Sequence, residues 1–565
     1  MKDKKLFIVL IAICILTVFP FLGESLFQSK GEPREAIVAY SMLDTGNWIL
    51  PVNNGGDIAY KPPFFHWCIA AVSQIGGQIT EYTSRLPSAI AMIIMTLGIY
   101  LFYAKRKKPN LALLTALITL TAFEVHRGGW ACRVDMVLTL FIVAALLQFY
   151  QWYERNERGI PFWAIIWMGC ATLTKGPVGI ILPCLVTGVF LLIKGRSFIS
   201  VAGKLILTGI ISCILPAIWY VAAYQQGGDN FLALVMEENF GRFMGKMSYG
   251  SHEHGFHYNF LTVLSGYVPY TLLALLALPM AIKNLKTWEK PKHWWNAFKN
   301  YIKTMDSARL FTLLSIVLIF VFYCIPKSKR STYLLPIYPF IAYFMAEFIY
   351  YLIQKKECIW KLYGQILAIV GILPIIAFFL IKGGIVSNML TPSLSNSSFG
   401  QIINIIETTP IDAIHWLYIL LPLIATCIFI RSVRNKRPIL YPVMGIIFTI
   451  YMSLDGVILP EVLNAKSDKP IAEAIQEKVP EGNIYGYISS DMMRFFTVNF
   501  YLGNRVLQFE IEKPEKGYLL IGPHDYEPFA QRYSDYQFEE VYRSEKKSCD
   551  TKAPIIMYRF EKKAQ

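Results

Sequence analysis

The residues best able to do chemistry in this sequence are charged side chains that flank apolar segments. Glu32 and Arg34 lie two positions apart in the first polar segment, and Lys61 precedes two prolines that restrict its backbone. Asp135 and Lys175 each lie beside an apolar run. A carboxylate can orient or deprotonate a hydroxyl group, and cations can hold a phosphate. The pattern therefore predicts that Glu32 and Asp135 are catalytic, and that Arg34, Lys61 and Lys175 bind a phosphate.

Three of these residues have simpler alternative roles. Glu32 could be an exposed acid at the start of a helix, where the helix dipole favours a negative charge. Asp135 could be the partner in an internal ion pair, since Arg133 lies two residues before it. Lys61 could be an interfacial lysine whose aliphatic stem lies along apolar surface. The sequence leaves these alternatives open.

A second basic cluster follows further along the chain. Lys329, Arg330 and Tyr333 combine two cations with an aromatic hydroxyl, and we expect them to bind the same phosphate. A membrane anchor is the alternative role of this cluster, although positive charge on the outer side opposes the topology rule. His252 and His254 are spaced i, i+2, so in an extended loop they face one side. A divalent metal is the one cofactor that this pair suggests, and hydrogen bonding within the loop is its alternative role.

The composition defines the class of protein that must position these residues. The chain has 565 residues, of which 55% are hydrophobic and 16% charged, and its mean hydropathy is +0.42. Soluble proteins average about 45–50% apolar and about 25% charged residues. A soluble, disordered or collagen-like chain is therefore excluded, and a polytopic α-helical membrane protein is predicted. The net charge of +15 resides in residues 1–465, where it indicates membrane topology and gives no support to nucleic-acid binding.

About thirteen apolar stretches could form transmembrane helices, each of which needs about 20 residues. The expected spans are 6–23, 86–104, 110–126, 136–152, 161–173, 177–193, 203–223, 258–282, 310–325, 333–353, 362–381, 413–430 and 438–458. Residues 64–75 are apolar but too short to cross, so we expect a juxtamembrane helix there. Basic loops alternate along the chain, which places the amino terminus in the cytoplasm and the carboxyl terminus outside.

The composition changes at Lys466. We therefore divide the chain into a transmembrane domain, 1–465, and a soluble α/β domain, 466–565. The hydrophobic pattern predicts a helix at 470–478 and strands at 483–488, 517–521 and 555–560. This segment contains no recognisable catalytic motif, so we expect it to be a docking or lid module.

Seven short motifs occur in a fixed order on the side of the predicted membrane that carries the terminal domain. They are Gly31-Glu32-Pro33-Arg34, Trp48-Ile49-Leu50-Pro51, Tyr60-Lys61-Pro62-Pro63, Arg85-Leu86-Pro87-Ser88, Asp135, Thr174-Lys175-Gly176-Pro177 and Ser328-Lys329-Arg330-Ser331-Thr332-Tyr333-Leu334-Leu335-Pro336. Together they resemble the bacterial GT-C glycosyltransferases of the aminoarabinose-to-lipid-A transferase type, which are related to protein O-mannosyltransferases.

The resemblance implies an inverting transferase of the GT-C fold that moves a sugar from a polyprenyl-phosphate donor to a lipid A-like, protein or glycan acceptor. It also implies a location in the bacterial inner membrane, with the site and the terminal domain on the periplasmic side. Gly31 stands where the family motif has Asp, and Tyr60 where it has Glu. A metal held by those acids would therefore be missing, or would need Glu32, Asp135 and one of the two histidines.

Two other classes of function compete with an enzyme. A lipid-linked sugar transporter or flippase would explain the spans, but it should show internal repeats and broken helices in matching halves. The sequence contains no such repeat, and its charges gather on one face instead of at mid-membrane. A non-enzymatic sensor would leave the residues of the first loop unexplained. We therefore expect a glycosyltransferase.

Overall fold

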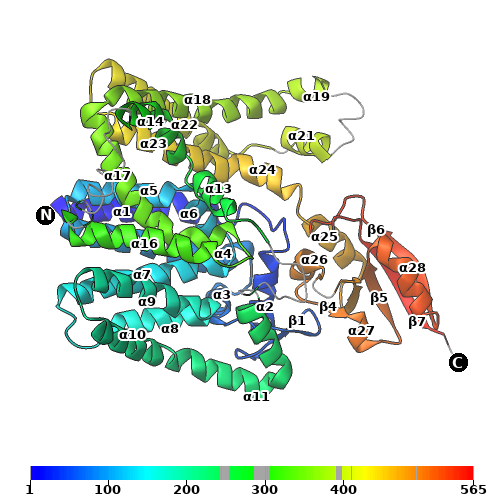
Figure 1. Cartoon of the computed structure of the whole chain (residues 1–565). Coiled ribbons are helices and arrows are strands. Elements are labelled where there is room, and N and C mark those ends of the chain that lie inside the picture. The colour runs from blue at the N-terminus through cyan, green and yellow to red at the C-terminus, as the bar shows by residue number, and fades with distance from the viewer. Residues whose placement is uncertain are drawn as a thin grey trace.

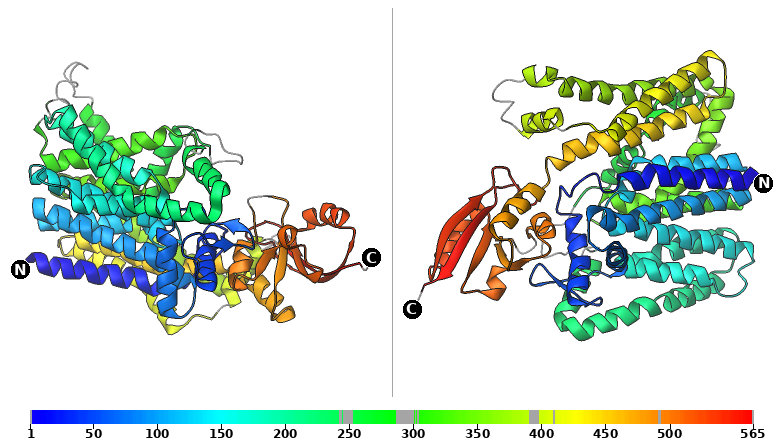
Figure 2. Two further views of the ribbon diagram at one scale, coloured as in Figure 1. Left: turned by 90° about the horizontal axis from the view of Figure 1, so that it is seen from below. Right: turned by 180° about the vertical axis from the view of Figure 1, so that it is seen from behind.

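A computed structural model shows a helical domain with a small sheet domain at one end (Figure 1). It describes residues 2–241, 253–285, 304–389, 398–408, 410–490 and 493–563, together with 244, 300 and 302. The amino terminus lies at the end of the helices remote from the sheet domain, and the carboxyl terminus lies beyond the sheet (Figures 1 and 2).

Among the described residues up to 464, the regular secondary structure is helical, apart from one short hairpin. The first nine are α1 (Lys2–Val18), α2 (Pro33–Thr45), α3 (Phe64–Gly76), α4 (Glu81–Arg106), α5 (Pro109–Thr121), α6 (Phe123–Gly129), α7 (Val134–Glu154), α8 (Phe162–Lys175) and α9 (Val178–Ile193). The later ones are α10 (Phe198–Ser212), α11 (Ile214–Met236), α13 (His257–Gly266), α14 (Tyr270–Leu285), α16 (Ser307–Cys324), α17 (Tyr338–Lys355), α18 (Glu357–Lys382), α19 (Ile385–Met389), α21 (Ser398–Thr408), α22 (Ala413–Arg434), α23 (Leu440–Ser453) and α24 (Leu459–Asn464). The 3₁₀ helix η3 (Ser331–Ile337) precedes α17.

Every predicted span corresponds to a helix or a pair of helices. In the described part of the chain, 8 helices are long and apolar enough to cross a membrane, or up to 11 if each of three bent pairs is one span. The bent pairs are α5 with α6, α10 with α11, and α13 with α14. The difference from about thirteen comes from α8 and α9, which have 14 and 16 residues and fall short of the length of about 20 that a span needs.

The predicted juxtamembrane helix, α3, lies between the transmembrane helices and the sheet domain, next to α2 (Figure 1). Proline at the first position of α2 fits a helix start, and Gly46, with φ of 69°, ends the helix in the left-handed conformation. The two helices pack against each other, and α3 also packs against α4. This outer layer therefore carries the residues of the first polar segment.

The opposite end of the helical domain is basic. Arg106 Nε donates to Glu154 Oε1 at 2.8 Å, and Lys107 Nζ donates to Asp306 Oδ2 at 2.7 Å. These contacts join the ends of α4 and α7 to the residue that precedes α16. The loops after α4 and α7 therefore share the face that lies away from the sheet domain (Figure 1).

The terminal domain is a mixed sheet flanked by short helices. Its elements are α25 (Lys469–Lys478), β3 (Ile484–Tyr487), α26 (Phe496–Tyr501), β4 (Val506–Gln508), α27 (Phe509–Glu512), β5 (Lys516–Ile521), α28 (Pro523–Arg532), β6 (Tyr536–Arg543) and β7 (Ile556–Lys562). The strand order is β4-β3-β5-β7-β6, in which β4, β3 and β5 run parallel while β7 is antiparallel to β5 and β6. The predicted helix lies within α25, and the three predicted strands overlap β3, β5 and β7.

A hairpin of β1 (Val52–Asn53) and β2 (Asp57–Ile58) from the first polar segment docks on the terminal domain. A Cβ atom on Gly55 would lie 2.6 Å from the Cα of Leu507, so only glycine allows the two backbones to approach this closely. Asp57 Oδ1 accepts hydrogen bonds from Arg494 Nη2 at 2.9 Å and from Gln508 Nε2 at 3.0 Å. The segment that leads to Lys61 is thus fixed on the terminal domain.

Candidate active site

Glu35, in the first turn of α2, is the centre of a cluster of ionisable side chains. Its Oε1 accepts from Lys61 Nζ at 2.8 Å and from Arg34 Nη2 at 3.3 Å, and its Oε2 lies 2.9 Å from Nε2 of the buried His66. An ionised carboxylate can only accept, so this histidine nitrogen carries the proton. Burial raises the pKa of the Glu35 carboxyl, but Lys61, His66 and Arg34 outweigh it and hold the pKa well below its usual range.

The two cations of this cluster remain open to a ligand. The side chains of Lys61 and Arg34 are 31% and 37% exposed, while their ends contact the buried Glu35. Desolvation and the nearby Arg34 guanidinium lower the pKa of Lys61 to about 8, although Glu35 opposes this shift. Each cation can therefore contact an anion from the open side, and that anion would compete with Glu35 for both.

Glu32 lies in a different environment from the one predicted for a base. It is buried at the position before α2, where its two oxygens accept from Arg85 Nε at 2.9 Å and Nη2 at 3.3 Å. The backbone N–H of Cys132 donates to it as well, at 3.0 Å. Burial raises the pKa of Glu32, but the Arg85 charge and these hydrogen bonds lower it overall. Glu32 is thus a buried ion-pair partner, neither the exposed helix-start acid nor a group free to accept a proton.

The side chain of Arg133 fills the space beside Gly31. A Cβ atom on Gly31 would lie 2.0 Å from Nη2 of Arg133, so the arginine occupies the space that any side chain at this position would need. An aspartate cannot be placed there without moving Arg133. Glu35, four residues further along the chain, is the carboxylate that faces the accessible cations instead.

A second ion pair lies at the ends of α7 and α8. Lys175 Nζ donates to Oδ1 of the buried Asp135, and the same ammonium lies 4.6 Å from the centre of the Tyr333 ring. Arg330 is close enough to interact electrostatically with Asp135, and its Nε is buried without a hydrogen-bond partner in the described part of the chain. The structure thus brings four predicted residues together. Asp135 has the ion-pair role that the sequence left open as an alternative.

The two clusters are neighbours on the outer layer. Arg133 is near enough to act electrostatically on both Glu32 and Asp135, and Cys132 is influenced by Glu32 and Glu35 alike. In the second cluster Lys175, Arg133 and Arg330 outnumber Asp135, so that part of the surface favours an anionic ligand. In the first cluster, Lys61 and Arg34 are balanced by Glu35 and the nearby Glu238.

The remaining predicted site residues do not join these clusters. Lys329 is buried, and its Nζ donates to the carbonyl oxygen of Pro326, so it holds its own loop. His254 is exposed and stacks on Tyr258 with ring centres 4.1 Å apart. His252 lies outside the described residues. The metal role predicted for the pair is therefore unsupported at His254, which belongs to no ligand-forming group among the residues described.

The outer layer does not fit a divalent metal. Its carboxylates Glu32, Glu35 and Asp135 are each bound to cations of the protein. Tyr60, which replaces the acid of the family motif, donates through its hydroxyl to Glu238 Oε1 at 3.1 Å. Among the described residues of this site, the buried His66 Nδ1 lacks a hydrogen-bond partner. A single ligand atom does not hold a divalent metal, so we derive no chemical step through one.

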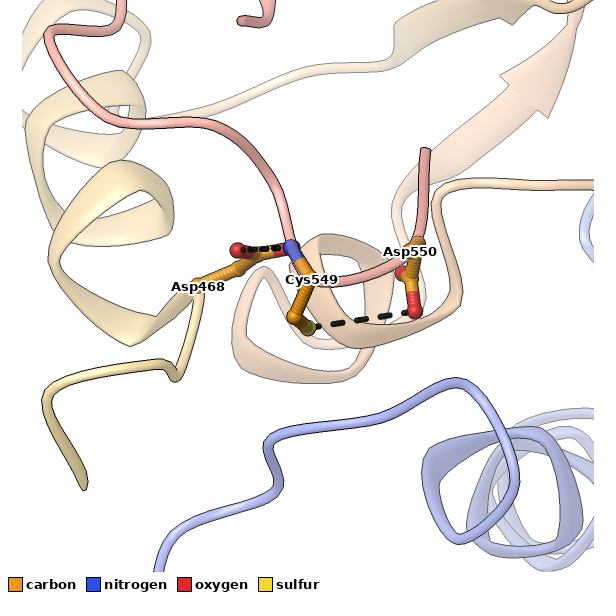
Figure 3. Close-up of side chains that lie close together, drawn as sticks. All are labelled: Asp468, Cys549 and Asp550. Atoms are coloured by element: carbon orange, nitrogen blue, oxygen red, sulfur yellow. Dashed lines mark hydrogen bonds between the residues drawn. The ribbon is translucent and has the colours of Figure 1, made fainter. Parts of the chain in front are cut away.

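One group in the terminal domain has metal-ligand residue types, namely Asp468, Cys549 and Asp550 (Figure 3). All four carboxylate oxygens already accept hydrogen bonds: those of Asp468 from Ser548 and the Cys549 backbone, and those of Asp550 from Thr497. Burial and the nearby Asp468 charge raise the pKa of Asp550 to about 7, against the hydrogen bonds from Thr497. This group joins α25 and α26 to the loop before β7, and we assign it a structural role.

Three residues of the site were not singled out from the sequence. Glu35 and Arg85 lay within the quoted motifs and their neighbours, and His66 lay in an apolar stretch. The signal for Glu35 was its position directly after Arg34, and the signal for His66 was a polar residue inside the apolar juxtamembrane helix. Neither signal predicts that Glu35 and His66 are in contact, because the contact depends on the packing of α2 on α3.

Known proteins share parts of this sequence. Residues 60–220 match the family model described as dolichyl-phosphate-mannose-protein mannosyltransferase. An uncharacterized protein of Aquifex aeolicus is 27% identical over 349 residues, which are 61% of this chain and 64% of that protein. The undecaprenyl phosphate-alpha-4-amino-4-deoxy-L-arabinose arabinosyl transferase of Shewanella sediminis is 26% identical over 332 residues, 58% of this chain and 56% of that protein. The chain thus matches somewhat over half the length of these relatives.

The fold extends the similarity to the whole chain. The crystal structure of ArnT from Cupriavidus metallidurans bound to undecaprenyl phosphate superposes with a TM-score of 0.70 at 18% identity, covering 98% of this chain and 97% of that one. The same protein in the apo state gives a TM-score of 0.71. The chain therefore has the polytopic GT-C fold of ArnT, with a small carboxyl-terminal sheet domain. The predicted fold class and the resemblance to the aminoarabinose transferase type are both confirmed.

Proposed function

We propose that this protein is a membrane glycosyltransferase that uses a polyprenyl-phosphate-linked sugar as its donor. The observation that carries the proposal is the cluster in which Glu35 forms ion pairs with the partly exposed side chains of Lys61 and Arg34. The names of the sequence relatives specify undecaprenyl phosphate-linked aminoarabinose, and the ArnT crystal structure contains undecaprenyl phosphate. Both are consistent with a lipid phosphate bound by these cations.

The donor phosphate would bind to Lys61 and Arg34 from their exposed side. As it bonds to them it weakens their hold on Glu35, because one cation cannot give its full charge to two anions. The Glu35 carboxylate then loses part of what depresses its pKa and becomes a better proton acceptor. Donor binding would in this way activate the carboxylate that the free protein keeps paired.

Sugar transfer would then be a single displacement at the anomeric carbon. The bond between that carbon and the phosphate oxygen breaks, and a bond to the acceptor oxygen forms from the opposite face, so the configuration inverts. Lys61 and Arg34 stabilise the charge that develops on the leaving phosphate. If the acceptor is a hydroxyl group, its proton passes to Glu35, while an ionised phosphate acceptor has no proton to lose.

The second cluster would bind the acceptor. The Lys175 ammonium contacts both Asp135 and the Tyr333 ring, and the buried Nε of Arg330 has no hydrogen-bond partner among the residues that the structure describes. We propose that this cluster binds an anionic group on the acceptor, for which a lipid A-like phosphate is the best fit. A protein or glycan hydroxyl is the alternative acceptor within the same class of enzyme. We place this site on the periplasmic side of the inner membrane, since the basic face lies opposite to it.

The test is transfer of radiolabelled sugar from a polyprenyl-phosphate donor to lipid A by the purified protein in proteoliposomes. We expect transfer by the wild type, a fall of about tenfold to a hundredfold for Lys61→Ala, and little change for Lys327→Ala, which removes an exposed lysine outside the clusters. Movement of intact donor across the bilayer without transfer would instead support a flippase. Equal losses in the two variants would show that Lys61 has no specific part in donor binding.

A further inference from the structure

A groove at the basic end of the helical domain has no part in the candidate active site. It has a volume of about 670 Å³ and lies between α1, α4 and α7, with Trp167 of α8 in its wall. Lys4, near the start of α1, and Lys105, near the end of α4, line it. The start of α1 lies at the end of the helical domain that is remote from the sheet domain (Figure 1). Most of its other lining side chains are aliphatic or aromatic.

The length of the groove matches one leaflet of a bilayer. Along α4 its lining runs from Ile94 to Arg106, which at 1.5 Å per residue is about 18 Å. Half of a hydrocarbon core of about 30 Å is about 15 Å. Gly98 keeps the wall open, because a Cβ atom there would find only the Leu147 side chain, at 3.9 Å. The groove can therefore hold an acyl chain from the end of the helices to mid-membrane.

The polar groups at its open end specify the head group. Lys4 and Lys105 are exposed and form no ion pair in the described part of the chain, whereas Arg106, which also lines the groove, is bound by Glu154. Gln148 and Gln151 line the same region. Two cations beside amide donors suit an anionic phosphate ester.

We propose that this groove binds an anionic glycerophospholipid of the leaflet opposite to the candidate active site. Its phosphate would contact Lys4 and Lys105, and one acyl chain would lie along Gly98 toward Trp167. The basic loops after α4 and α7 gather at this same face, as they do where a protein meets an anionic leaflet. The proposal is independent of the glycosyltransferase function, because the groove shares no residue with that site.

The proposal is tested by native mass spectrometry of the full-length protein titrated with phosphatidylglycerol or with phosphatidylcholine of the same acyl chains. Each lysine near an anionic head group contributes about fivefold in affinity, so we expect about thirtyfold weaker phosphatidylglycerol binding in the double variant Lys4→Gln, Lys105→Gln. The matched control Lys5→Gln, Lys108→Gln removes two exposed lysines that do not line the groove, and should bind as the wild type does.

A second variant tests the groove independently of charge. Gly98→Leu fills the wall with a side chain that favours helix, so the protein should fold while the acyl chain is excluded and binding of both lipids falls. The proposal is overturned if the wild type binds the two lipids equally, if the control pair loses as much affinity as the groove pair, or if Gly98→Leu binds phosphatidylglycerol normally.

Discussion

Replacing Glu35 with glutamine should reduce turnover by about a hundredfold to ten thousandfold if Glu35 accepts the proton of a hydroxyl acceptor. That range corresponds to about 3 to 5 kcal/mol of barrier. Glutamine keeps the shape of the side chain but removes the charge that Lys61, Arg34 and His66 now contact. Donor affinity should stay the same or rise up to about tenfold, because the amide no longer competes with the phosphate for the two cations.

The assay should separate turnover from donor binding. Sugar transfer in proteoliposomes gives kcat and KM, and equilibrium binding of a labelled donor gives Kd. The pH should be about 6.5, because the loss of Glu35 removes a charge that raises the pKa of Lys61, and Lys61 must stay protonated in both proteins. A purely structural role for Glu35 would instead weaken donor binding and lower the unfolding temperature together.

Glu32→Gln is the matched control, since it removes one carboxylate charge from the same turn of chain. It leaves Arg85, whose side chain is 4% exposed, without its hydrogen-bonded counter-charge, and breaking such a buried pair costs about 3–5 kcal/mol of stability. We expect a lower unfolding temperature but near-normal turnover per folded molecule. An inactive, fully stable Glu32→Gln beside an active Glu35→Gln would refute our assignment of the two acids.

Three further outcomes follow from the structure. The pKa of Lys61 is about 8, and only the ammonium form binds phosphate, so donor affinity should be full well below pH 8 and fall as the pH rises through this value. The variant Lys61→Arg should show a flat pH profile of donor Kd to pH 9. Transfer should survive dialysis against a chelator, because the outer-layer carboxylates are bound to protein cations; a loss restored by a divalent metal would contradict this. Gly55→Val should detach the hairpin from the terminal domain and expose the junction to limited proteolysis, while Gly77→Val, also at positive φ but with no atom within 4 Å, should not.

The sequence was sufficient to predict that the chain is a membrane protein, where its helices lie, and that the motifs gather at one end of the helical domain. Composition and apolar run length decide these features, and both can be counted along the chain. The number of spans differs from the prediction because α8 and α9 are too short to qualify alone. In the terminal domain, β4 and β6 were not predicted, since β4 has only three residues and two glutamates interrupt the apolar pattern of β6.

The choice between the two acids of α2 could not be made from the sequence. Glu32 and Glu35 are three residues apart, and either could meet a cation from another loop. Arg85 from α4 and Lys61 from the first loop decide between them, at 2.9 and 2.8 Å. Both cations are close to α2 only after the helices have packed. The tertiary structure therefore decides which cation pairs with each acid, and this pairing sets the role of the acid.

The terminal domain helps to position Lys61 and Glu35, although it has no recognisable catalytic motif. Buried Asn499 donates to Asn54 Oδ1 at 3.0 Å and to Asn504 Oδ1 at 3.2 Å, and Asn504 in turn donates to Ser41 Oγ of α2 at 3.1 Å. A buried polar network of this kind favours one geometry, because any displacement leaves a donor or acceptor unpaired. It joins the hairpin, which leads to Lys61, to the helix that carries Glu35. Because the network fixes both partners of the central ion pair, loss of the terminal domain should disturb the site without removing any residue from it.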